Sequence, residues 1–196
     1  EKCLINMIIH HNYQNGRHIM RTLIKILSIF GIVAILATIL YIRGFFLPSY
    51  IQWKNINLSM DLNQDGIKEI YQLKNKQAII QFENETYEFD REWFISDIKI
   101  DDIDQDGVKE LLMLVWNRTN YGDYSPFWDT NDTLHFSQHL YVFTIQNDSI
   151  HSKWMSSSLR PNIKNWEIRN HELVLTDPDD ETTVWKWIDF GFERFE

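Results

Sequence analysis

The hydrophobic pattern of the chain changes once, near residue 47. From Ile26 to Ile42 the sequence contains no charged residue over 17 positions. An uncharged apolar segment of this length can cross a bilayer as a single helix. Beyond it, short apolar runs alternate with polar residues and are bounded by Asn, Asp and Gly, which is typical of β-strands joined by turns. The pattern therefore predicts one transmembrane helix near the N-terminus, followed by a mainly β domain.

Basic residues precede this apolar segment and set its expected orientation. Arg17, Arg21 and Lys25 lie on its N-terminal side, and segments rich in Lys and Arg stay in the cytoplasm. We therefore interpret residues 20–47 as an uncleaved signal anchor that leaves the chain from about residue 47 onward outside the cytoplasm. Two other interpretations are a cleaved signal sequence and a core helix buried in the protein.

The segments on either side of this anchor have expectations of their own. Residues 1–19 show no periodic apolar pattern and do not begin with Met, so we expect a disordered cytoplasmic tail or an extension that is not native. Pro48 and Ser49 are expected to end the helix, because proline cannot continue its hydrogen bonds. The folded, extracytoplasmic domain is then expected over residues 51–196.

The same ten-residue pattern occurs twice in the β domain, 41 residues apart. The copies are DLNQDGIKEI at Asp61–Ile70 and DIDQDGVKEL at Asp102–Leu111. Alternate oxygen-bearing side chains on a tight loop can converge on one hard cation, and a glycine suits the sharp turn in the middle. The ligands predicted for the first loop are Asp61, Asn63, Asp65, the carbonyl of Ile67 and Glu69. Those predicted for the second loop are Asp102, Asp104, Asp106, the carbonyl of Val108 and Glu110.

These loops differ from the calcium loop of an EF-hand. An EF-hand has its bidentate glutamate at the twelfth position and lies between two helices, whereas here that position holds Gln72 and Met113. The apolar residues around each loop indicate strands on both sides. Asp-Gly turns between strands also occur without a metal, which is the alternative interpretation. Because the second loop has four carboxylates and the first has three, we expect the second loop to bind a cation more tightly.

A strand, an acidic loop and a second strand, recurring after 41 residues, resembles the FG-GAP or VCBS repeat of integrin-type β-propellers and bacterial surface proteins. The resemblance is carried by residues 56–73 and 97–116. It implies a Ca²⁺-stabilised β structure that serves adhesion, ligand binding or scaffolding, with repeats over about residues 51–92 and 93–140. A third acidic cluster, DPDDE at 177–181, lacks the glycine and indicates a degenerate C-terminal repeat.

The length of the β domain limits its architecture. A closed propeller typically needs four or more blades, which at this period would take about 160 residues. The expected fold is therefore an antiparallel blade-like or sandwich-like β domain with calcium-type loops, preceded by one transmembrane helix. The only cysteine, Cys3, precedes the apolar segment, so the domain can contain no disulfide.

The charge of the β domain argues against one class of partner. The first 50 residues carry five of the 19 basic residues and one of the 28 acidic residues, which leaves 14 basic and 27 acidic residues in the rest. Such an acidic domain lacks the clustered Lys and Arg that nucleic-acid binding requires. Cations are the expected partners of this surface.

Residues 117–138 interrupt the strand pattern with an irregular segment rich in Asn, Asp, Tyr and Trp. Long irregular segments in compact domains are often functional, and this one is expected to bind a protein or a glycan, or to cap the core. No convincing catalytic motif accompanies it. The sequence therefore predicts a membrane-anchored, non-enzymatic Ca²⁺-binding adhesion or scaffold module. The alternative is a glycan-active extracytoplasmic enzyme, or enzyme subunit, with structural calcium loops.

Overall fold

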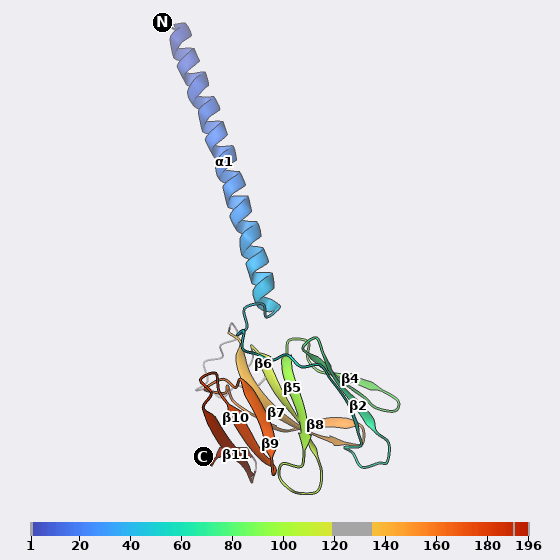
Figure 1. The fold of residues 1–196 in the computed structure, drawn as a ribbon. Helices are drawn as coiled ribbons and strands as arrows, with labels where there is room; N and C mark the ends of the chain where they lie inside the picture. Colours follow the sequence, from blue (N-terminus) through green and yellow to red (C-terminus); the bar gives the residue numbers. More distant parts are fainter. Residues whose placement is uncertain (1, 119–134, 190, 196) are drawn as a thin grey trace. The chain divides into compact units, whose positions relative to one another are not determined.

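The computed structural model describes residues 2–118, 135–189 and 191–195. It divides into two units, with the boundary between Leu47 and Pro48. Among the described residues, the first unit contains one helix and the second contains twelve strands in three antiparallel sheets (Figure 1). The prediction of one N-terminal apolar helix followed by a mainly β domain is confirmed.

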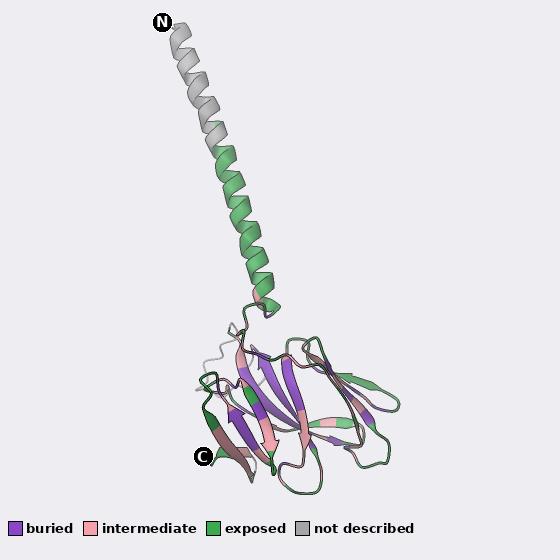
Figure 2. Cartoon of the chain, in the orientation of Figure 1, coloured by how far each residue is buried: buried purple, intermediate pink, exposed green. Residues whose placement is uncertain are grey.

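Helix α1 runs from Lys2 to Ile42. Its segment Met20–Ile42 has 23 residues, a mean hydropathy of 2.6 and an exposed surface (Figure 2), so it is long and apolar enough to span a membrane. At about 1.5 Å per residue it is about 35 Å long, compared with about 30 Å for the hydrocarbon core of a bilayer. The start at Lys2 differs from the expected disordered tail. Once the apolar turns are helical, each further residue adds a hydrogen bond at little cost, and residues 2–19 contain no proline.

The helix ends at a glycine cap rather than at Pro48. Gly44 has a φ of 66°, a left-handed conformation that glycine adopts without strain. Its N–H donates to the carbonyl of Tyr41 at 2.9 Å, and the N–H of Phe45 donates to the carbonyl of Leu40 at 3.0 Å. This pair of bonds is a Schellman motif. The prediction that proline stops the helix is therefore wrong.

Each sheet is a four-stranded meander in which every strand pairs with its neighbours in the sequence. The first sheet contains β1 (Ile56–Met60), β2 (Glu69–Lys74), β3 (Gln77–Gln81) and β4 (Thr86–Glu88). The second contains β5 (Phe94–Asp101), β6 (Glu110–Asn117), β7 (Ser137–Gln146) and β8 (Ser149–Met155). The third contains β9 (Asn165–Arg169), β10 (Glu172–Thr176), β11 (Thr182–Ile188) and β12 (Gly191–Arg194). The β7–β8 turn has positive φ at both Asn147 and Asp148, as a two-residue hairpin of the favoured type requires.

The second sheet is covered on both faces. Strand β6 is buried at all eight positions, and successive side chains of a strand point to opposite faces. Leu111, Met113 and Val115 pack in one core with residues of the first sheet. Leu112 and Leu114 pack in a second core with residues of the third sheet. The three sheets therefore form a stack with the second sheet in the middle, where Figure 2 shows strand β6 buried along its length.

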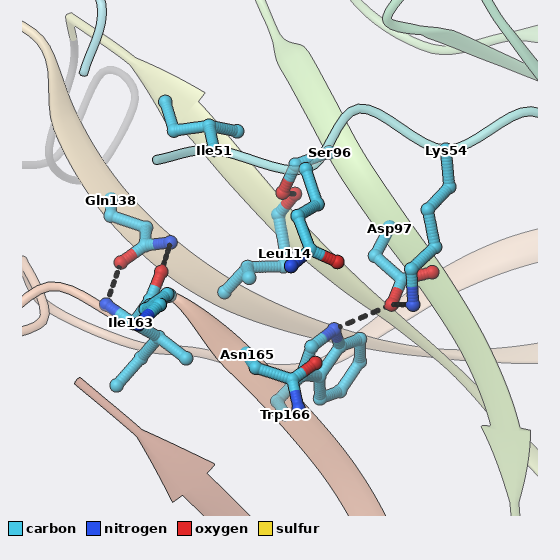
Figure 3. A pocket seen from close by; sticks show the side chains of 11 residues that line it. Ile51, Lys54, Ser96, Asp97, Leu114, Gln138, Ile163, Asn165 and Trp166 are labelled. Carbon is cyan, nitrogen blue, oxygen red and sulfur yellow. Dashed lines mark hydrogen bonds and ion pairs between the residues drawn. The ribbon is translucent and has the colours of Figure 1, made fainter. Parts of the chain in front are cut away.

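A buried carboxylate joins the second sheet to the third (Figure 3). Asp97 on β5 is 3% exposed and accepts hydrogen bonds from the ammonium of Lys54 at 2.7 Å and the indole N–H of Trp166 at 2.8 Å. Nearby, the side-chain amide of Gln138 bonds to both the N–H and the carbonyl of Ile163. Both arrangements satisfy polar groups that would otherwise be costly to bury. They hold β9 and the segment before it against the second sheet.

Candidate metal centres

The two repeated loops occupy the same place in successive sheets. Residues 61–68 join β1 to β2, and residues 102–109 join β5 to β6. Antiparallel pairing makes Glu69 and Glu110 the first paired residues of the returning strands. The repeat in the sequence is therefore also a repeat in the structure.

Backbone conformation is also shared by the loops. Gln64 and Gln105 have φ angles of 60° and 61°, and Gly66 and Gly107 both have 90°. Residues other than glycine enter this region uncommonly, so the same unusual turn has formed twice. The positive φ explains why both copies of the motif have glycine at the sixth position.

The carboxylates of the motif hold the loop backbone in the same way in both copies. In the first loop, Asp61 accepts a hydrogen bond from the N–H of Gly66 at 2.9 Å. Asp65 accepts one from the N–H of Ile67 at 2.7 Å, and Glu69 accepts one from the N–H of Leu62 at 3.0 Å. The second loop repeats all three bonds between the equivalent residues. These bonds position the carboxylates without the help of a metal ion.

Within each loop, three carboxylates converge, with one oxygen from each lying within 4.8 Å of the others. The glutamates of the two groups are 2% and 0% exposed. Asp61 and Asp104 each have a buried oxygen without a hydrogen-bond partner among the described residues. Like charges this close repel one another unless a cation offsets them, so both oxygen sets fit a metal ion. The two groups are Asp61, Asp65 and Glu69 in the first loop and Asp102, Asp104 and Glu110 in the second.

The predicted ligands Asn63 and Asp106 have contacts of their own. The amide oxygen of Asn63 accepts the N–H of Asp65 at 3.1 Å, and its amide nitrogen donates to Asp148 at 2.8 Å. Asp106 lies outside the second group, although its carboxylate is 3.9 Å from the ammonium of Lys153. The two backbone carbonyls of the motif stay predicted ligands.

A lysine from the fourth strand of the second sheet reaches the second loop. The ammonium of Lys153 on β8 lies 2.7 Å from Glu110 and forms an ion pair with Asp104. Burial alone would lower the pKa of Lys153, but hydrogen bonds to these two carboxylates and their charges raise it above its usual value. Burial raises the pKa of Glu110, against the lowering effect of the lysine. Lys153 therefore stays protonated and gives the second loop a cation from the chain itself.

Within the described part of the chain, the first loop has no such internal cation. Among the described residues, no Lys, Arg or His forms an ion pair with Asp61, Asp65 or Glu69. Glu69 instead accepts a hydrogen bond from the hydroxyl of Tyr71 at 2.8 Å. Burial, and then this hydrogen bond and the nearby carboxylate charges, raises the pKa of Tyr71 far above its usual value, so its hydroxyl stays a donor. The two loops thus share their geometry and differ in charge balance.

The two candidate centres are neighbours. The side-chain amide of Gln64 in the first loop donates to the carbonyl of Gly107 in the second at 3.1 Å. The bond from Asn63 to Asp148 joins the first loop to the β7–β8 turn as well. The first loop therefore rests against the second sheet through polar side chains of its own motif.

The acidic cluster at 177–181 occupies a different kind of turn. It joins β10 to β11, the second and third strands of its sheet, whereas the repeated loops join first and second strands. Asp177 is buried and accepts hydrogen bonds from the N–H groups of Asp179 at 2.9 Å and Glu181 at 3.0 Å. The third sheet therefore does not repeat the acidic loop at the equivalent position.

Most of the segment expected to bind a protein or glycan, residues 119–134, lies outside the described residues. On β7, His139 is fully buried, with its ring nitrogens bonded to the hydroxyl of Ser137 at 2.8 Å and the carbonyl of Ser156 at 3.1 Å. Burial lowers the pKa of His139, so the ring is neutral. Because both nitrogens are used within the protein, neither is left for a metal.

No family model matches the chain, and no curated protein or solved structure matches it. The resemblance to FG-GAP or VCBS repeats is therefore carried by the sequence motifs alone. We infer function from the geometry of the acidic loops and from the apolar helix.

Proposed function

We propose that the chain is a membrane-anchored, extracytoplasmic binding module without enzymatic activity, whose β domain is stabilised by Ca²⁺. One observation carries the proposal: two equivalent loops each bring three carboxylates together, and each group includes a fully buried glutamate. The apolar segment Met20–Ile42 supports the anchor. The basic residues before it support an N-terminus in the cytoplasm.

The ligand chemistry favours Ca²⁺ over transition metals. Both groups consist of carboxylates alone, without His or Cys, and oxygen sets of this kind suit hard cations. Ca²⁺ takes about six to eight oxygens in a flexible geometry. Three carboxylates, the carbonyl of Ile67 or Val108 and water molecules can supply that number. Mg²⁺ requires a stricter octahedron, which makes it the natural comparison in any binding experiment.

The two loops are expected to differ in affinity. A cation that enters the second loop must displace the ammonium of Lys153 from Glu110 and Asp104, or share these carboxylates with it. In the part of the chain that the structure describes, no ammonium pairs with the carboxylates of the first loop, so a cation entering it has none to displace. Each loop offers one buried carboxylate oxygen without a hydrogen-bond partner among the described residues, so this feature does not distinguish them. We therefore expect the first loop to bind Ca²⁺ more tightly. This order is the reverse of the one obtained by counting carboxylates in the sequence.

A structural cation also disfavours catalysis by the same carboxylates. A carboxylate that a metal keeps ionised is a poor proton donor. Glu69 and Glu110 are further held by backbone N–H groups of their own loops. The strand–loop–strand unit of FG-GAP or VCBS repeats corresponds to the first hairpin of two of the sheets. This resemblance and the unsuitability of the carboxylates for catalysis support a role in adhesion or scaffolding.

Thermal unfolding of the full-length chain in detergent tests the metal proposal. Ligand that binds only the native state stabilises it by about 2.7 kcal/mol at 100 times Kd, which for a domain of about 150 residues is about 5–10 °C in Tm. Tm should rise by this amount between EDTA and millimolar Ca²⁺, and Asp61→Ala should remove most of the rise. Glu85→Ala, which changes an exposed carboxylate in the β3–β4 turn, should leave the rise intact. Equal melting temperatures in Ca²⁺ and EDTA would refute the proposal.

A further inference from the structure

A cavity of about 460 Å³ lies at the third sheet, and none of the grouped carboxylates of the acidic loops lines it. Its walls come from the end of β8, the segment after it and strands β10–β12. Cavities of about 300–1,000 Å³ are the usual size of small-molecule sites. The side chains that define its chemistry are Trp154, Arg160, Asp177, Glu181, Trp185 and Phe192.

Aromatic rings form one wall of this cavity. Trp154 and Phe192 meet edge to face with ring centroids 5.5 Å apart, and both also contact Trp187, at 6.3 Å and 5.2 Å. Such edge-to-face contacts fix ring orientation. Trp185, which also lines the cavity, donates its indole N–H to the hydroxyl of Thr183 at 2.8 Å, and this bond holds its ring.

Gly191 allows this aromatic wall to form. A Cβ at this position would lie 2.8 Å from the indole nitrogen of Trp154. Any larger residue would therefore push the indole away from β12. The glycine at the start of β12 thus lets the ring of Trp154 pack directly on the backbone.

Charged and hydroxyl groups form the rest of the lining. The side chains of Arg160 and Glu181 make no hydrogen bond or ion pair among the described residues, although both line the cavity. Asp177 is 7% exposed, and its bonds to two backbone N–H groups keep the turn that carries Glu181 closed. Ser157 and Ser158 add hydroxyls. The cavity therefore offers both donors and acceptors beside flat apolar surfaces.

The balance of charge selects the class of ligand. Two guanidinium groups, from Arg160 and Arg194, and two carboxylates, from Asp177 and Glu181, line the cavity, so their formal charges cancel. A strongly charged ligand of either sign would meet like charges. A purely apolar ligand would remove water from these ions without replacing its hydrogen bonds.

A neutral polyol with apolar C–H faces satisfies both parts of the lining. Its hydroxyls can donate to carboxylates and accept from guanidinium groups, while its C–H faces pack against aromatic rings. We propose that this cavity binds a short neutral saccharide. The cavity does not include the acidic loops, so saccharide binding can be tested independently of Ca²⁺ binding.

Binding of neutral saccharides to the full-length chain in lipid nanodiscs tests this proposal, since sugar-headed detergents would compete. The probes are di- and trisaccharides of glucose, galactose, mannose and their N-acetyl derivatives, detected by saturation-transfer NMR and quantified by calorimetry. At least one should bind in the millimolar range or tighter. Glu181→Gln and Trp185→Ala should each weaken that binding by about tenfold, whereas Glu85→Gln in the β3–β4 turn should have no effect.

Glu181→Gln also separates this site from the acidic loops. Glu181 is exposed, so the substitution should preserve the fold and leave the Ca²⁺-dependent rise in Tm unchanged. The proposal is overturned if no probe binds at millimolar concentration, or if binding survives both substitutions. Tighter binding of short peptides than of every saccharide would also overturn it, and would assign the cavity to a peptide instead.

Discussion

Replacing Lys153 by methionine would remove the internal cation of the second loop and keep most of the side-chain length. The lysine side chain is 18% exposed, and its partners Asp104 and Glu110 are 18% and 0% exposed. Removing one partner of a buried ion pair costs about 3–5 kcal/mol, because the remaining charge is left uncompensated. Since the lysine and Asp104 keep some contact with water, we expect the lower value, about 3 kcal/mol, in the absence of metal.

Thermal unfolding in EDTA and in Ca²⁺ measures both consequences of Lys153→Met. In EDTA the variant should melt about 6–12 °C below the wild type, at about 2–4 °C per kcal/mol for a domain of this size. In Ca²⁺ the freed carboxylates should bind the ion, so the rise in Tm should exceed that of the wild type. Lys74→Met, which changes an exposed lysine at the end of β2, is the control. A Lys153→Met variant with wild-type stability in EDTA, or with an unchanged Ca²⁺ response, would refute this reasoning.

Four further substitutions test the fold of the β domain. Asp97→Ala should lower the free energy of unfolding by about 3 kcal/mol, because Trp166 and Lys54 lose their buried acceptor. Urea unfolding measures this loss, and a value below about 1 kcal/mol would contradict the prediction. Burial lowers the pKa of His139. Below a pH of about 6.5 the ring therefore takes up a proton in the unfolded chain but not in the folded one. The free energy of unfolding of the wild type should consequently fall as the pH drops below about 6.5, by up to about 1.4 kcal/mol per pH unit. His139→Gln should remove that part of the slope, so equal slopes in the two proteins would contradict it. Gly107→Ala should cost about 1–2 kcal/mol from its φ of 90° alone, since the space around it is open, and Gly66→Ala should cost the same; a neutral result at either position would show that the loop backbone relaxes.

The apolar helix and the loop turns could be predicted because their causes are local. An uncharged run of 17 residues indicates a membrane-spanning helix by itself. Gly66 and Gly107 mark the positions where φ is positive in the structure. The continuous apolar run LLMLVW also predicted strand β6. Which sheet covers each of its faces depends on contacts between segments far apart in the chain, and the sequence pattern does not specify these.

Lys153 could not be paired with its carboxylates from the sequence. It lies 43 residues after Glu110, and the meeting of the two depends on how β7 and β8 return across the sheet. Counting carboxylates therefore favoured the second loop, whereas the structure puts an ammonium there. The end of the helix was predicted wrongly for a local reason. In the sequence Pro48 is a stronger stop signal than Gly44, but Gly44 caps the helix.

The measurement that most directly tests cation binding is a crystal structure of the chain grown in millimolar Ca²⁺, with anomalous scattering used to locate the ion. We predict an anomalous peak about 2.3–2.6 Å from oxygens of Asp61, Asp65 and Glu69, stronger than any peak in the second loop. A structure without that peak, in which the three side chains point apart into solvent, would contradict the proposed role of the acidic loops.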